Sequence, residues 1–130
     1  MDPAAADFDG DGHVDIALSN YFGILYVYLG GGDGTFTRLE RPIPAKAVSS
    51  DTADVNGDGH ADLVFQKYYA NTDEYYTLLG NGDGTFADPI VFHGQPGSYH
   101  WGMTLADFDE DGSPELVASA KWHSTVLYFH

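Results

Sequence analysis

Cysteine is absent from the 130 residues of the chain, which excludes disulfide frameworks, thiolate metal sites and cysteine nucleophiles. Basic residues are scarce as well: five Lys and Arg stand against twenty Asp and Glu, and the formal charge is −15. A charge of this size repels nucleic acid phosphates and anionic membrane surfaces. We therefore expect no nucleic acid partner, and cations are the natural counterpart of the chain.

Long apolar runs are missing too. No segment approaches the roughly 18 to 20 apolar residues of a membrane span, so we expect no membrane insertion. The chain opens with Met1-Asp2-Pro3, which lacks the basic and apolar regions of a secretory signal. Either the protein is made without a signal, or the sequence is a fragment or mature form.

Helical periodicity is the third absence, whereas short apolar and β-branched runs punctuated by Gly, Asp and Asn recur along the whole chain. The sequence is 43% hydrophobic and 15% aromatic, which is enough for a folded core despite the acidity. These features predict one all-β domain of ordinary size over residues 1–130.

Two words of sequence repeat along the chain. The acidic word "DFDGDGHVDIAL" at 7–18 returns as "DVNGDGHADLVF" at 54–65 and as "DFDEDGSPELVA" at 107–118. The glycine word "YLGGGDGTF" at 28–36 returns as "LLGNGDGTF" at 78–86. Self-similarity at a fixed period indicates a repeat architecture.

Three repeats follow from these words, at 1–45, 46–96 and 97–130, and the third ends before its last strand. A complete unit has four strands, and the first repeat has a truncated lead strand. The strands are expected at 4–7, 15–19, 24–29, 36–42, 46–54, 62–68, 74–79, 86–92, 101–107, 115–120 and 125–129.

The segment Ile24-Leu25-Tyr26-Val27-Tyr28-Leu29 is apolar or aromatic on both alternating faces, which predicts a sheet covered on both sides. Small four-stranded antiparallel sheets, each packed between like neighbours, are the blades of a β-propeller. The chain holds about two and a half such blades, so the ring is incomplete unless copies assemble. A β-sandwich of similar strands is the alternative.

Each acidic word places oxygen ligands at alternate positions of a glycine-containing loop, a pattern that suits a hard cation such as Ca²⁺. Side chains occupy positions 1, 3, 5 and 9, and a backbone carbonyl supplies position 7. The predicted ligands, about three sites in all, are Asp7, Asp9, Asp11, His13 and Asp15, then Asp54, Asn56, Asp58, His60 and Asp62, then Asp107, Asp109, Asp111, Ser113 and Glu115.

Two other interpretations of these loops were weighed. A helix-flanked calcium hand needs a bidentate Glu at position 12, but Leu18, Phe65 and Ala118 stand there. A solvated acidic turn explains one copy but not three in register. Eleven of the twenty acidic residues are predicted ligands in these loops, and their repulsion needs neutralising by cations. Magnesium is less suitable, because it prefers fewer protein ligands and near-octahedral geometry.

The third loop departs from the other two, with Glu110 in place of glycine at position 4, Pro114 at position 8 and the longer Glu115 at position 9. We expect it to bind the metal more weakly. In the glycine words, Asp33 and Asp83 precede glycine and are predicted to form hairpin turns.

Together the two words resemble the FG-GAP and VCBS repeats of integrin α-chain propellers, propeller lectins and bacterial surface proteins. The resemblance covers nearly the whole chain. It implies a propeller of usually about seven blades, with calcium in the loop between the first two strands of each blade. It transfers only to the metal ligands named above and carries no ligand pocket, because the fold alone does not decide function.

We interpret the chain as a binding or adhesion module for protein or carbohydrate, or an extracellular scaffold, and not as an enzyme. Tyr99, His100 and Trp101 are the preferred candidates for contact with a ligand, because aromatic rings stack on sugars and anchor protein partners. One alternative is a self-assembling subunit of a ring or fibre. A propeller-based polysaccharide lyase or hydrolase is less favoured, because no acid–base pair stands clear of the loops.

The chain is expected either to be part of a longer propeller or to form a homo-oligomer, since closing a ring takes at least about four blades. Loops of this kind fill at the calcium concentration outside cells. We therefore expect an extracellular, cell-surface or periplasmic location.

Overall fold

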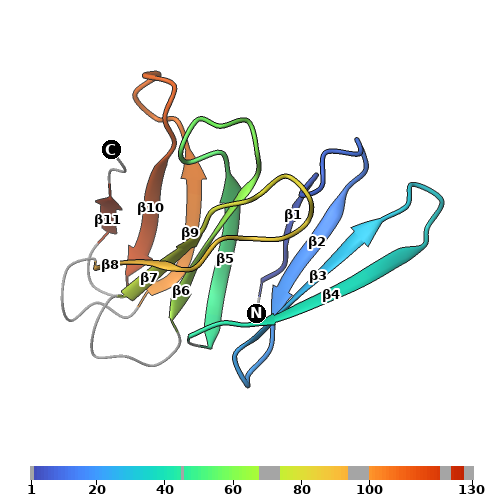
Figure 1. Ribbon diagram of the computed structural model, residues 1–130. Coiled ribbons are helices and arrows are strands. Elements are labelled where there is room, and N and C mark those ends of the chain that lie inside the picture. The colour runs from blue at the N-terminus through green and yellow to red at the C-terminus, as the bar shows by residue number, and fades with distance from the viewer. Residues whose placement is uncertain (1, 45, 68–73, 94–99, 121–123, 128–130) are drawn as a thin grey trace.

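The computed structural model describes residues 2–44, 46–67, 74–93, 100–120 and 124–127, and within these ranges it contains strands and no helix (Figure 1). The strands are β1 (Ala4–Ala6), β2 (Asp15–Ser19), β3 (Ile24–Gly30), β4 (Phe36–Pro42), β5 (Ala47–Ala53), β6 (Asp62–Lys67), β7 (Glu74–Leu78), β8 (Ile90–His93), β9 (His100–Ala106), β10 (Glu115–Ala120) and β11 (Ser124–Leu127).

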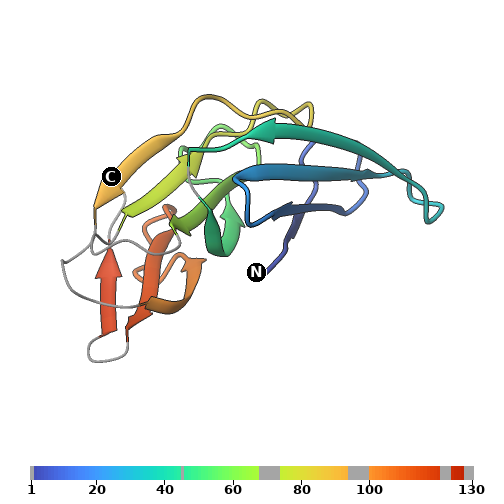
Figure 2. The ribbon, with the colours of Figure 1, turned by 90° about the horizontal axis from the view of Figure 1, so that it is seen from below.

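The strands form three antiparallel sheets in chain order. The first sheet is β1-β2-β3-β4, the second is β5-β6-β7-β8, and the third is the three-stranded sheet β9-β10-β11. Figure 2 shows the second sheet lying between the other two. The lead strands β1, β5 and β9 lie side by side, and the three sheets do not close into a ring (Figure 1). These are partial blades of a β-propeller, as the sequence predicts.

The strand predictions agree closely with the structure except at β8. The bounds of β2, β4 and β10 are those expected, but β8 begins at Ile90 instead of residue 86. Phe86 forms only an isolated bridge with Gly80, and the N–H of Ala87 then donates to the carbonyl of Leu79. Pro89 follows, and because it has no N–H to donate, the ladder cannot run continuously into β8.

The core lies between the sheets. Between the first and second sheets, Leu25 and Val27 of β3 pack with Leu63 and Phe65 of β6, and all four are buried. Between the second and third sheets, Tyr75 of β7 packs in a separate cluster with residues of β9 and β10. The second sheet is therefore covered on both faces.

The first sheet differs from the prediction that both of its faces are covered. Leu25 and Val27 are buried against the second sheet, but Ile24, Tyr26 and Tyr28 on the opposite face are only half-buried. The physical reason is that, among the described residues, no sheet packs against this face. The apolar pattern of β3 correctly indicates a face that can be buried, but burying it requires another sheet.

Candidate metal loops

The three acidic words form the loops β1–β2, β5–β6 and β9–β10, each between the first two strands of its sheet. All three loops lie at the same end of the sheets (Figure 1). The shared placement follows from the antiparallel pairing, because every lead strand runs in the same direction and turns back at the same end.

The first aspartate of each loop holds the loop closed. The Asp7 carboxylate accepts hydrogen bonds from the N–H groups of Gly10 and Gly12, at 2.7 and 2.9 Å. The donation from Gly12 is the largest cause that holds the pKa of Asp7 below its ordinary value. Asp7 is therefore more readily ionised in the folded loop than a free aspartate.

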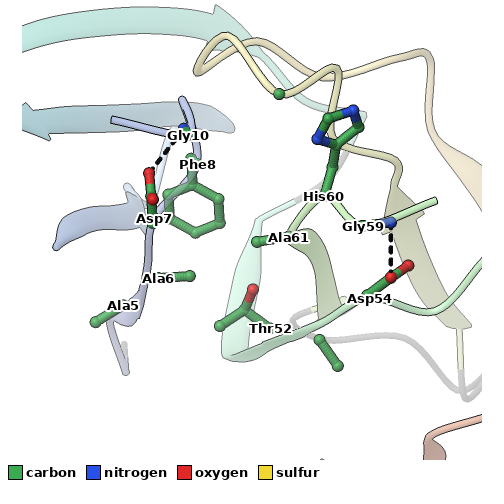
Figure 3. A pocket seen from close by; sticks show the side chains of 12 residues that line it. Ala5, Ala6, Asp7, Phe8, Gly10, Thr52, Asp54, Gly59, His60 and Ala61 are labelled. Carbon is green, nitrogen blue, oxygen red and sulfur yellow. Dashed lines mark hydrogen bonds between the residues drawn. The ribbon is translucent and has the colours of Figure 1, made fainter. Parts of the chain in front are cut away.

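The second loop repeats this arrangement. Asp54 accepts from the N–H groups of Gly57 and Gly59, at 2.7 and 2.8 Å. Figure 3 shows the first aspartate of both loops bonded to a loop glycine. In the third loop, Asp107 accepts from the N–H groups of Asp111 and Gly112, at 3.1 and 2.9 Å. The loops are thus formed by backbone hydrogen bonds of the same kind.

The last carboxylate of each loop is buried, and in the first two loops it links the two repeated words. Asp62 is fully buried and accepts from the N–H of Val55 at 2.8 Å and from the N–H of Gly80 at 2.7 Å. Asp15 accepts in the same way from Phe8 and Gly30, both at 2.7 Å. The carboxylate therefore ties the acidic loop to the glycine word of its own repeat.

Sequence reasoning assigned Asp15 and Asp62 to the metal alone and missed this second role. The only signal was that a glycine word follows each of the first two acidic words, with Gly30 lying 15 residues after Asp15 and Gly80 lying 18 residues after Asp62. Burial raises the pKa of the Asp62 carboxyl, and the two backbone donors oppose that rise. Glu115 is also buried and accepts from the N–H of Phe108 at 2.7 Å.

The structure brings carboxylate oxygens together in two of the loops. The side chains of Asp7, Asp9 and Asp15 each offer an oxygen within 4.8 Å of the others, and in the third loop the same holds for Asp107, Asp109, Asp111 and Glu115. Removal from water raises the pKa of Asp9, and the neighbouring carboxylates add to that rise. Carboxylates that lie this close repel one another when ionised. A hard divalent cation suits such a cluster, because its charge offsets the repulsion.

Three other predicted side-chain ligands form hydrogen bonds within their own loops. In the second loop, the Asn56 amide donates to the Asp58 carboxylate at 2.9 Å, and this contact is the largest cause lowering the pKa of Asp58. In the first loop, Asp11 accepts from the N–H of His13 at 2.8 Å and is not part of the cluster of three. These hydrogen bonds hold Asp11, Asn56 and Asp58 within their own loops.

His13, His60 and Ser113 were predicted to offer their carbonyls, and that prediction stays open. Their N–H groups donate to Asp11, Asp58 and Asp111, at 2.8, 2.9 and 2.8 Å. The two imidazole rings are exposed, and each lies against a glycine of the glycine word.

Only glycine fits beneath these rings. A Cβ on Gly32 would lie 2.3 Å from Cε1 of His13, and one on Gly82 would lie 2.4 Å from Cε1 of His60. Both glycines also have φ of 74°, in the left-handed region that favours glycine. The imidazole rings therefore form a second link between the acidic loop and the glycine word.

Asp33 and Asp83 form turns, as predicted. The N–H and the hydroxyl of Thr35 both donate to Asp33, at 3.0 and 2.6 Å, and the N–H of Thr85 donates to Asp83 at 2.9 Å. The threonine hydroxyls are the largest cause that lowers the pKa of both carboxyls.

A pocket of about 480 Å³ lies between the first two loops (Figure 3). Asp7 and Phe8 line it from the first sheet, and Asp54, His60 and Thr52 line it from the second. Residues of the first two acidic loops and of the strands before them line the pocket, so it belongs to the candidate metal loops and is not a separate site.

The sequence model of the FG-GAP-like repeat matches the chain twice, at residues 7–65 and 54–118, which is more than half of its length. The chain belongs to the FG-GAP-like repeat family. Each match begins at one acidic loop, includes the next acidic loop and ends in the strand that follows that loop. Each match therefore spans the boundary between two sheets. Comparison with curated proteins gave no match.

Among the described residues of this FG-GAP-like chain, no helix is long and apolar enough to cross a membrane.

The aromatic ligand candidates are not tested by the structure. Tyr99 lies outside the described residues, and His100 and Trp101 are described only as backbone of β9.

The third loop contains a strained residue. Glu110 has φ of 62°, where the equivalent Gly10 and Gly57 both have 76°. A non-glycine residue in this region costs about 1 kcal/mol or more. The sequence signal for a weaker third loop, a missing glycine, therefore has a structural counterpart in backbone strain.

Replacing Glu110 by glycine should relieve this strain. We expect Glu110→Gly to raise the free energy of unfolding by about 1 kcal/mol, measured by chemical denaturation without calcium. Glu110→Ala is the charge control, since it removes the carboxylate but keeps the strained backbone. Gly57→Ala should destabilise by a similar amount, because a Cβ there meets nothing within 4 Å and only the backbone is strained. Equal effects of Glu110→Gly and Glu110→Ala would show that charge, not conformation, is responsible.

Proposed function

We propose that this FG-GAP-like chain is a calcium-binding β-propeller module. The observation that carries the proposal is the convergence of carboxylate oxygens within 4.8 Å in the first and third loops. Backbone N–H groups of each loop donate to its first aspartate, so this predicted ligand is held in place before binding. Such preorganisation favours affinity, because less conformational entropy is lost on binding.

The ligands proposed are the side chains at positions 1, 3, 5 and 9 and the carbonyl at position 7 of each loop. In this proposal the carboxylates of Asp15, Asp62 and Glu115 bind the ion and also accept hydrogen bonds from backbone N–H groups. The ion would thereby reinforce the link between loop and sheet. Bound Ca²⁺ supplies charge neutralisation and bridging between strands. Its role here is structural, stabilising the loop end of each blade.

The module serves recognition or scaffolding of protein or carbohydrate partners in this proposal, not catalysis. Support comes from the first and third loops, where carboxylate oxygens lie within 4.8 Å of one another, an arrangement suited to holding a cation. Extracellular calcium is high enough to fill loops of this type. An extracellular, cell-surface or periplasmic site of action is therefore part of the proposal.

Calcium stoichiometry tests the proposal directly. We expect isothermal titration calorimetry and native mass spectrometry of the calcium-free chain to give about three bound Ca²⁺, the third more weakly than the others. Asp9→Asn should weaken the first site by about tenfold or more, because the charge of the ligand set sets the affinity.

Asp33→Asn is the matched control for Asp9→Asn. It removes the same charge from the first repeat at a carboxylate that bonds Thr35 in a turn. The control should leave the stoichiometry and affinity unchanged. Absence of bound calcium in the unsubstituted chain, or equal losses in the two variants, would contradict the proposed loop sites.

A further inference from the structure

The contact between the first two sheets is built around one pair of phenylalanines. Phe8, in the first acidic loop, packs edge to face on Phe86 of the second glycine word, with ring centroids 5.4 Å apart. The two side chains are 2% and 7% exposed. The carbonyl of Phe8 also accepts from the N–H of Gly84 at 2.9 Å. An acidic loop of one sheet therefore docks on the glycine word of the next.

The same residue positions occur at the two ends of the chain without a neighbouring sheet. Phe108 holds the position of Phe8 in the third acidic loop and is 57% exposed. Phe36 holds the position of Phe86 in the first glycine word and is 51% exposed. Each end thus carries one unpaired half of the contact seen inside the chain.

The strand faces show the same difference. In the second sheet, Leu63, Phe65, Tyr76 and Leu78 lie in the core against the first sheet. Their counterparts in the first sheet are all half-buried, and they are Ile16, Leu18, Tyr26 and Tyr28. Repeat-equivalent residues therefore differ in burial because, among the described residues, no sheet packs against this face of the first sheet.

The opposite face of the third sheet matches the face that the first sheet offers to the second. Ala17 of β2 is fully buried against the second sheet, and its counterpart Val117 of β10 is half-buried. Gly34 is exposed and a Cβ there would meet nothing within 4 Å, whereas its counterpart Gly84 is buried against Leu29 of the first sheet. The backbone of Gly34 thus lies open at the position where Gly84 receives an acidic loop.

We propose that a second copy of this chain docks head to tail, with Phe108 of one copy packed on Phe36 of the next. The interior contact between the first two sheets is the template. The occupant is a copy of the chain because its own two ends carry the complementary halves, at equivalent positions and with the same residue type. The contact is heterologous, so repetition produces a ring if the rotation closes and a filament if it does not.

Sedimentation velocity of the intact chain over a concentration series, in millimolar calcium, tests this proposal. The chain should associate reversibly, and Phe108→Ala and Phe36→Ala should each weaken association by about tenfold or more, as expected of buried aromatic anchors. Phe22→Ala is the matched control, because Phe22 is 85% exposed and belongs to the β2–β3 turn, at the end of the first sheet away from the acidic loops (Figure 1). It should leave association unchanged.

Engineered cysteines give a second, positive measurement, since the chain has no cysteine of its own. Phe108→Cys and Phe36→Cys chains, mixed under mild oxidation, should form a crosslinked pair that neither variant forms alone. A chain that stays monomeric at every concentration overturns the proposal and assigns the end faces to other blades or partners. Association that survives both alanine substitutions, or crosslinks formed equally by each variant alone, also overturns it. Calcium titration of Phe108→Ala is a separate measurement, so loss of metal binding and loss of docking are distinguishable.

Discussion

Chelation of calcium should lower the free energy of unfolding of the chain by several kcal/mol. Each filled site adds about 2.7 kcal/mol when free calcium exceeds its dissociation constant a hundredfold. Three sites would then contribute about 8 kcal/mol, which is comparable to the whole stability of an ordinary domain. The apo chain also retains the mutual repulsion of its clustered carboxylates. The measurement is thermal and chemical denaturation followed by circular dichroism, in calcium and in excess chelator.

Magnesium at the same concentration is the control for this experiment. It should restore only a small part of the lost stability, because its near-octahedral preference suits these loops poorly. Higher monovalent salt should recover some stability in chelator by screening the carboxylates. An unfolding transition that is identical in calcium and in chelator would contradict metal binding by the folded loops.

Asp62→Ala should be among the most destabilising single substitutions in the second repeat. The Asp62 carboxylate is fully buried and receives the N–H groups of Val55 and Gly80. Removing it leaves both donors buried without their acceptor and severs the link between the acidic loop and the glycine word. We expect a loss of about 3 to 5 kcal/mol in the free energy of unfolding. Chemical denaturation in chelator measures this loss apart from any effect on calcium.

Asp58→Ala is the matched control, in the same loop and with the same change of charge. Asp58 is exposed and bonds only within the loop, to Asn56 and the N–H of His60. Its substitution should cost much less stability than Asp62→Ala in chelator while reducing calcium affinity. Equal destabilisation by the two substitutions would contradict the distinct structural role assigned to Asp62.

Much of the fold was predictable because its signals are local. The acidic and glycine words mark the turns, and alternation of apolar residues between them marks the strands, so ten of the eleven strands begin within two residues of their expected positions. The exception, β8, depends on Pro89 and on the bridge between Gly80 and Phe86, which periodicity does not report. Asp33 and Asp83 were also predictable, because an Asx turn involves only residues two apart.

The candidate metal loops were predictable as a set but not in detail. Alternate oxygen-bearing residues identify the loops, yet Asp11 lies outside the carboxylate cluster of the first loop and Asn56 bonds to Asp58 in the second. These side-chain choices depend on local hydrogen bonds that spacing does not specify. Weaker binding in the third loop stays a prediction from the residues at Glu110, Pro114 and Glu115, and the structure adds that Glu110 has a positive φ.

The repeat, the antiparallel strands and the three acidic loops can be predicted from the sequence alone, because each depends on residues close together in the chain. Tertiary packing buries Asp15, Asp62 and Glu115, and it brings the N–H groups of Gly30 and Gly80 to Asp15 and Asp62, which joins two words of sequence. It also decided which of two equivalent residues is covered: Phe86 is buried and Phe36 is exposed, although both occur in the same "GDGTF". Burial depends on the sheet that lies alongside, and no local pattern specifies that neighbour.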